Sequence, residues 1–241
     1  MFAPDVIMPI AMARLLRDSE TVFHGVASLL PMVAILLAKK LHAPDLVYLN
    51  ITGSTDPSPD TLPGSSVDPA LFAHTRSRVT LSDLFDLSAR GKLDTAFLSG
   101  VQIDRHANIN MSMIPGANGD LERPRVRLPG GAGSAAIMPS AKRTILWRTR
   151  HDPRTFVEAV AFRTTGGNVE RVVTPLCVFK RVNGLLEIES LHPDTSAAEV
   201  QAQTGWPLGL SGETPRTPAP TVAEQDALRA VDPGNVRLLE F

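Results

Sequence analysis

Strands and helices alternate along the first hundred residues of the chain, and this alternation restricts the fold more than any other feature. Short apolar runs at residues 21–25, 46–51 and 96–100 predict strands, and the segments at residues 30–41 and 80–91 predict helices between them. The run at 46–51 is almost wholly apolar, which is typical of a strand buried on both faces of a parallel sheet. The pattern therefore predicts an α/β fold with right-handed crossovers.

The remaining segments extend this fold at both ends. A helix is expected over Asp5–Arg17, beginning as late as Pro9 because proline disrupts a helix interior. Asn183-Gly184 between two apolar runs predicts a β-hairpin. The other expected elements are a strand at 143–147, a helix at 195–203, a Pro/Thr linker at 213–220 and a last helix at 221–231. We expect a single domain over residues 1–241, with the linker leading to a C-terminal helix.

Two segments lack apolar periodicity and are candidates for function. Residues 52–69 contain four prolines besides Gly, Ser and Asp, and a loop of this length is usually functional or mobile. Leu128–Ala136 contains Pro129-Gly130-Gly131-Ala132-Gly133 ahead of the apolar pair Ile137-Met138, which predicts a short helix. Free N–H groups in such a loop bind a phosphate or the oxyanion of a reaction, and the alternative is a tight turn without a ligand.

Composition excludes several classes of function. The chain has 43% apolar residues, enough for a sizeable core, and 24 Lys and Arg balance 25 Asp and Glu. A formal net charge of -1, with only a local cluster at Arg123, Arg125 and Arg127, argues against a nucleic-acid partner. Aromatic residues amount to 5%, which also disfavours base stacking.

Cysteine and histidine usage argues against disulfides and metals. Cys177 is the only cysteine and lies in an apolar run, so we expect a small core residue and no intrachain disulfide. The six histidines show no metal-ligand spacing, and no metal site is expected. The longest apolar run, residues 26–38, is too short to span a bilayer, and no secretory signal precedes it. A cytoplasmic protein without membrane contact is expected.

Three blocks carry a family resemblance. Leu98–Asn110 is similar to the G-x-Q-V-D-x-x-G-N-x-N block of family I CoA-transferase β subunits. The glycine loop at 129–134 resembles their P-G-x-G-G segment, and Ala141-Lys142-Arg143 follows it as in their A-K-R/K-V-I strand. The third block joins Val178-Phe179-Lys180 and Asn183-Gly184 to residues 191–193 and 200–204. Ala43-Pro44-Asp45 ahead of a strand also resembles the glutaconate CoA-transferase β subunit. The resemblance runs from about residue 5 to the C-terminus.

The resemblance implies an open, mostly parallel sheet of the NagB/RpiA/CoA-transferase type with a C-terminal hairpin and helices. It implies a homologous α subunit as partner, in a heterodimer or heterotetramer, and a coenzyme A thioester as substrate with no permanently bound cofactor. In that family a glutamate of the β subunit attacks the thioester, and amides of the glycine loop stabilise the oxyanion. Covalent catalysis of this kind divides one difficult transfer into two easier ones.

Carried onto this chain, the motifs give two sets of candidate site residues. The catalytic candidates are Gly131, Ala132 and Gly133 as the oxyanion and thioester loop, with Gln102, Thr52 and Gly53. The CoA-binding candidates are Gly130, Ser134, Asp104 and Asn108. Capping of a loop is the alternative for Gln102, Asp104 and Asn108.

Three further residues are weighed for the same site. His106 lies in the first block and is a candidate proton donor or an ordinary loop residue. Lys142 and Arg143 either approach the phosphates of CoA or lie at a solvated strand edge.

One departure from the family decides the mechanism. The nucleophilic glutamate belongs to an E-S-G or E-N-G segment, which here reads Ile51-Thr52-Gly53. Isoleucine cannot carry CoA. Either Asp56 or Asp60 replaces the glutamate, or the α subunit supplies the acid, as in steroid-ring-degrading CoA hydrolases, or the chain is a non-catalytic CoA-binding or assembly subunit. We predict the β-type subunit of a heteromeric acyl-CoA-processing enzyme, a transferase or a hydrolase.

Overall fold

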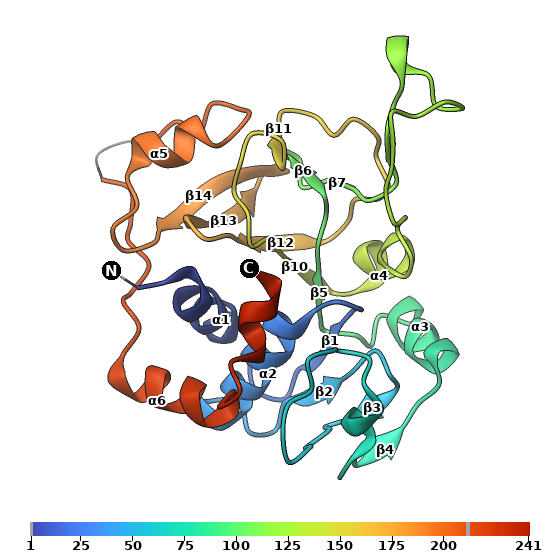
Figure 1. Ribbon diagram of the computed structural model, residues 1–241, viewed down its shortest axis with the longest axis vertical. Helices are drawn as coiled ribbons and strands as arrows, with labels where there is room; N and C mark the ends of the chain where they lie inside the picture. The colour runs from blue at the N-terminus through green and yellow to red at the C-terminus, as the bar shows by residue number, and fades with distance from the viewer. Residues whose placement is uncertain (1, 211–212) are drawn as a thin grey trace. The chain divides into compact units, whose positions relative to one another are not determined.

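The computed structural model describes residues 2–210 and 213–241 (Figure 1), which form two compact units. The first unit comprises Met1–Phe97, Ser140–Arg143 and Pro218–Phe241, and the second comprises Leu98–Pro139 and Thr144–Thr217. Each unit has its own strands and helices. The expectation of one domain over residues 1–241 stays a prediction.

The first unit contains four α-helices and two 3-10 helices among its described residues, and three of the α-helices pack on one another. The helices are α1 (Pro4–Arg14), α2 (Leu29–Leu41), α3 (Leu81–Ala89), α6 (Val222–Val231) and the 3-10 helices η1 (Pro69–Phe72) and η3 (Val236–Glu240). Helices α1, α2 and α6 lie side by side (Figure 1). Helix α1 begins at Pro4, where a missing N–H is tolerated, and continues through Pro9, so the expected late start is wrong. Thr80 and Asp83 form the capping box that starts α3.

The strands of the first unit form a parallel centre with an antiparallel edge. They are β1 (Thr21–His24), β2 (Val47–Leu49), β3 (Ser54–Thr55), β4 (Ser77–Arg78) and β5 (Thr95–Leu98), in the order β5-β1-β2-β3-β4. Strand β1 pairs in parallel with β2 and β5, whereas β3 pairs antiparallel with β2 and β4. All four residues of β5 are buried. The predicted α/β class with buried parallel strands is confirmed.

In the second unit, four strands lie in the order β10-β12-β13-β14. They are β10 (Arg143–Trp147), β12 (Val169–Val173), β13 (Cys177–Val182) and β14 (Leu185–Leu191). Strands β10 and β12 are parallel, and β13 and β14 form the predicted hairpin. Asn183 and Gly184 have φ values of 49° and 85°, the left-handed conformation that a two-residue hairpin turn requires. Cys177 is buried in this sheet, as expected of a core residue.

The smaller elements of the second unit carry most of the candidate residues. One small sheet contains β11 (Phe156–Val157), β6 (Gln102–Asp104) and β7 (Ile109–Asn110), and a second contains β8 (Met113–Ile114) and β9 (Val126–Arg127). The helices are η2 (Ala117–Gly119), α4 (Ser134–Ser140) and α5 (Ala197–Ala202). Helices α4 and α5 were predicted from the sequence and the small sheets were not, because strands of two or three residues leave too short a periodic pattern.

The segment at 213–220 contains no helix or strand, and Arg216 bridges to Leu191. Helix α6 follows it, begun by a capping box of Thr221 and Glu224. Within the described residues, every helix is too short or too polar to cross a lipid bilayer.

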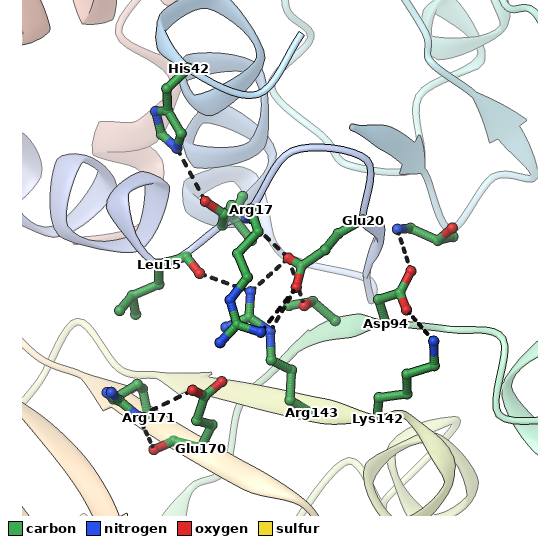
Figure 2. A network of polar contacts seen from close by, with 12 residues as sticks. Leu15, Arg17, Glu20, His42, Asp94, Lys142, Arg143, Glu170 and Arg171 are labelled. Carbon is green, nitrogen blue, oxygen red and sulfur yellow. Dashed lines mark hydrogen bonds and ion pairs between the residues drawn. The ribbon is translucent and has the colours of Figure 1, made fainter. Parts of the chain in front are cut away.

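Arg143, the first residue of β10, belongs to the first unit and forms a buried ion pair there (Figure 2). The Arg143 guanidinium lies 2.6 Å from the Glu20 carboxylate and donates to the Leu15 carbonyl at 2.8 Å. Both charged side chains are only about a tenth exposed. Neither a solvated edge nor a phosphate contact describes Arg143, so both expectations are wrong for it. Lys142 differs, because its exposed ammonium pairs with Asp94 at 2.6 Å.

Candidate functional site

Gln102 presents an oriented amide donor. Its Oε1 atom accepts hydrogen bonds from Asn110 Nδ2 at 2.9 Å and from the Ala161 backbone N–H at 3.1 Å. Two donors on one oxygen fix which end of the amide is oxygen, so Nε2 is the free end. The side chain is half-buried, and within the described chain Nε2 has no hydrogen-bond partner. Gln102 therefore offers an N–H donor whose direction is set before any ligand arrives.

The segment from Asn110 to Ser112 joins Gln102 to the glycine loop. Asn110 Nδ2 donates both to Gln102 Oε1 at 2.9 Å and to the Met113 carbonyl at 2.8 Å. The Met111 carbonyl accepts the N–H of Gly130 at 2.6 Å. Because Met111 directly follows Asn110, one short stretch positions both candidate parts of the site. Sequence reasoning did not identify this role of Asn110.

The glycine loop contains three consecutive amides that are free to bind an anion. The N–H groups of Gly131, Ala132 and Gly133 have no hydrogen-bond partner within the part of the chain that the structure describes. The next amide, Ser134 N–H, donates to the Gly131 carbonyl at 2.9 Å. Gly131 and Gly133 are half-buried and Ala132 is exposed, so a ligand can reach these groups. Preorganised amides of this kind are the donors of an oxyanion hole.

Two glycines of this loop cannot be replaced without strain. Gly130 has φ of 94°, a conformation that glycine adopts at little cost. A Cβ atom on Gly131 would lie 2.7 Å from Thr164 Cγ2. Thr164 is itself fixed, since its hydroxyl oxygen accepts the Met111 N–H at 2.8 Å and bonds the Ser112 hydroxyl at 2.7 Å. Thr164 was not identified from the sequence, because no motif contains it.

Ser134 contributes to the shape of the loop. Its hydroxyl donates to the Gly131 carbonyl, and α4 begins at the same residue. The hydroxyl is therefore already occupied by the loop. This geometry favours a structural role for Ser134, which holds the shape of the loop that carries the neighbouring amides.

Asp104 and Asn108 stabilise the turn between β6 and β7. The Asp104 carboxylate is buried and accepts the backbone N–H groups of His106 and Asn108, each at 2.9 Å, and the Asn108 side-chain amide at 3.1 Å. Ala107, at the family's glycine position, has φ of 63°, and these bonds hold it there. The geometry favours turn capping over ligand contact for Asp104. His106 is exposed at the tip of this turn.

The turn at Ile51-Thr52-Gly53, which the resemblance aligns with the family's E-S-G segment, lies in the first unit. The Gly53 N–H donates to the Asn50 carbonyl at 2.9 Å, and the Thr52 N–H donates to Asn50 Oδ1 at 2.8 Å. Gly53 has φ of 93°, and a Cβ there would lie 2.2 Å from the Val79 carbonyl oxygen. The main chain at Ile51 is therefore tightly defined, and its side chain is half-buried.

A buried polar cluster lies directly before this turn. The Gly25 carbonyl bonds His24 Nδ1 at 2.8 Å, which places the ring proton there and leaves Nε2 to accept the Tyr48 hydroxyl at 2.5 Å. Asn50 Nδ2 donates to the Tyr48 oxygen at 2.9 Å. Burial lowers the pKa of His24 to about 4, although the bond to Gly25 opposes this, so the ring is neutral near pH 7. Burial likewise raises the pKa of Tyr48.

The two aspartates proposed as replacement nucleophiles, Asp56 and Asp60, differ in their contacts. Asp56 Oδ1 lies 2.9 Å from Lys39 Nζ and accepts the Tyr48 N–H at 3.0 Å, and Arg76 approaches the other oxygen at 3.6 Å. These contacts use the Asp56 carboxylate to stabilise the edge of the sheet. Asp60 is exposed. No group of three His, Cys, Asp or Glu side chains suited to a metal occurs in residues 2–210 and 213–241.

Comparison with known proteins identifies the class of the chain. The Coenzyme A transferase family matches residues 6–202, and the chain belongs to this family. This confirms the enzyme class predicted from the three sequence blocks and the fold that the resemblance implied.

Relatives extend the match to nearly the full chain. The chain is 32% identical to the β subunit of 3-oxoadipate CoA-transferase from Pseudomonas knackmussii, over 96% of this chain and 94% of that protein. It is 25% identical to the β subunit of glutaconate CoA-transferase from Acidaminococcus fermentans, over 93% and 91%. The decarboxylase AibA/AibB superposes with a TM-score of 0.91 at 32% identity, over 100% of this chain and 99% of that chain. The prediction of a β-type subunit of a CoA-transferase-like enzyme is confirmed.

Proposed function

We propose that the chain acts with an α-type CoA-transferase subunit on an acyl-CoA, and that it supplies the oxyanion-binding side of the site. The observation that carries this proposal is the run of three amides at Gly131, Ala132 and Gly133 that have no partner among the described residues, with the oriented Gln102 amide fixed to the same stretch of chain. Relatives named as one subunit of a CoA-transferase support the two-chain assembly. A CoA thioester is the substrate that the family implies.

The chemistry of a thioester requires such donors. When a nucleophile adds to the thioester carbonyl carbon, the C=O electron pair moves to oxygen and creates an oxyanion. The oxyanion then collapses, the C–S bond breaks, and the sulfur leaves as CoA thiolate. Amides that point at the oxygen stabilise the intermediate more than the neutral thioester, and removing one such donor lowers kcat by roughly 10²- to 10³-fold.

The carboxylate that attacks or activates comes from the α-type subunit in this proposal. Ile51 has no reactive group, and Asp56 is engaged by Lys39. Thr52 and Gly53 then shape the turn at Ile51, and Gly130 and Ser134 shape the glycine loop. Relatives of equal identity are named for CoA transfer and for decarboxylation, so proteins of this fold are named for more than one reaction.

The second candidate is a non-catalytic CoA-binding or assembly subunit. The specific observation in its favour is Ile51 at the nucleophile position. In this case the amides of the glycine loop bind the thioester without accelerating a reaction. The two candidates differ in what happens when the glycine loop is altered in an active complex.

Thioester turnover with and without the partner tests the proposal. We expect no turnover by the isolated chain, and turnover once an α-type subunit is added. Gly131→Val in the complex is expected to lower kcat by about 100-fold, since the added side chain displaces the loop amides. Gly234→Ala is the matched control for a glycine substitution, because a Cβ atom there meets nothing closer than Val236 Cγ1 at 3.9 Å. Turnover by the isolated chain, or full kcat in the Gly131→Val complex, contradicts the proposal.

A further inference from the structure

We infer that His24, Tyr48 and Asn50 form a positioning network that fixes the turn from Asn50 to Gly53 in the geometry that catalysis by the two-subunit enzyme requires. The inference rests on the proposed function, in which the carboxylate comes from the α-type subunit because the turn carries Ile51. None of the three side chains touches substrate, because all three residues are fully buried. They act through the backbone of the turn.

The hydrogen bonds form a chain in which Thr52 donates to Asn50, Asn50 to Tyr48 and Tyr48 to His24. Asn50 Oδ1 accepts the Thr52 N–H at 2.8 Å, and Asn50 Nδ2 donates to the Tyr48 oxygen at 2.9 Å. Tyr48 in turn donates to His24 Nε2 at 2.5 Å. Since the two ends of one amide are used by different partners, Asn50 cannot rotate without breaking a bond at both ends. The orientation of the Thr52 peptide is thereby tied to the parallel strands β1 and β2.

Stability alone does not explain this cluster. Buried polar groups gain little net free energy over apolar ones of similar shape, and each is costly when a partner is missing. Three of them occur together at the carboxyl ends of the parallel strands β1 and β2, and ligands of open α/β sheets bind at the carboxyl ends of strands. The charged groups that face Tyr48 are Asp56, which accepts the Tyr48 N–H at 3.0 Å, and Lys39, which pairs with Asp56 at 2.9 Å; the two charges compensate each other.

A set of four variants separates positioning from general stability. Asn50→Ala removes both bonds of the amide, whereas Asn50→Ser keeps a short acceptor for the Thr52 N–H. Tyr48→Phe removes only the hydroxyl. Thr204→Val is the matched control, because Thr204 bonds the buried His151 ring at 2.9 Å in a comparable histidine cluster of the second unit.

Kinetics of the complex and amide exchange of the chain are the two readouts. We expect Asn50→Ala to lower kcat by about 10- to 100-fold, with KM changed less than about threefold, as misplacement of a site element does. We expect a smaller loss for Tyr48→Phe, recovery of most of kcat in Asn50→Ser, and kcat within about twofold of wild type in Thr204→Val. Hydrogen exchange at residues 50–53 of the isolated chain should accelerate in Asn50→Ala and stay unchanged in Thr204→Val.

Equal kcat in Asn50→Ala and Thr204→Val would overturn the inference, as would unchanged exchange at residues 50–53 in Asn50→Ala. If Asn50→Ala does not fold, Tyr48→Phe decides by the same two readouts. Absence of turnover in the wild-type complex would contradict the proposed function instead. In that case the exchange experiment still tests whether the network holds the turn.

Discussion

Replacement of Gln102 by leucine is expected to lower the kcat of the two-subunit enzyme by roughly 10²- to 10³-fold. Leucine has a similar volume but removes the Nε2 donor, and it leaves Asn110 Nδ2 and the Ala161 N–H without their shared acceptor. The loss should fall mainly on kcat, because an oxyanion donor is used most fully in the transition state. Steady-state kinetics with one acyl-CoA measure this directly.

Gln203→Leu serves as the matched control for the Gln102 experiment, since Gln203 is half-buried at the end of α5 and belongs to no part of the proposed site. Its kcat should stay near that of wild type. A Gln102→Leu enzyme with unchanged kcat and raised KM would show that Gln102 binds CoA without stabilising the oxyanion.

The second large effect concerns stability. Arg143→Met is expected to lower the free energy of unfolding by about 3 kcal/mol, because removing one partner of a buried ion pair leaves an unpaired charge. Glu20 would lose its contact at 2.6 Å while remaining only 12% exposed (Figure 2). Arg17 cannot fully replace it, since its guanidinium lies 3.8 Å away and is mostly exposed.

The neighbouring Lys142 provides the control for this prediction. Lys142→Met removes an equally short contact, to Asp94 at 2.6 Å, but the lysine side chain is 59% exposed. An exposed pair contributes less than about 1 kcal/mol, so the free energy of unfolding should hardly change. Urea denaturation of both variants measures the difference. Equal losses in the two variants would show that burial does not set the strength of the Arg143 pair.

Local patterns predicted most of the fold. The apolar run before Asn50 indicated a buried strand, and Asn183-Gly184 indicated the β13–β14 hairpin, because both signals depend on neighbouring residues alone. The position of Arg143 could not be predicted in this way. Its partner Glu20 lies 123 residues earlier in the sequence, and only the folded chain brings the two together.

The candidate site was predicted in part. The glycine loop and Gln102 were identified from motifs, and the structure adds why they suit an anion: the loop amides are unpaired and Asn110 fixes the Gln102 amide. The network of His24, Tyr48 and Asn50 was missed. His24 and Asn50 are single polar residues at the ends of apolar runs, a signal that becomes meaningful only when β1 and β2 pair.

In the proposed function, this chain binds the thioester oxyanion and the α-type subunit provides the carboxylate. Peptide mass spectrometry of the two-subunit enzyme tests it, after treatment with an acyl-CoA and then with borohydride or hydroxylamine to trap covalent intermediates. We expect no modified glutamate or aspartate in this chain, whether or not the α-type subunit is modified. A trapped adduct on a carboxylate of this chain, Asp56 or Asp60 above all, would contradict the proposed division.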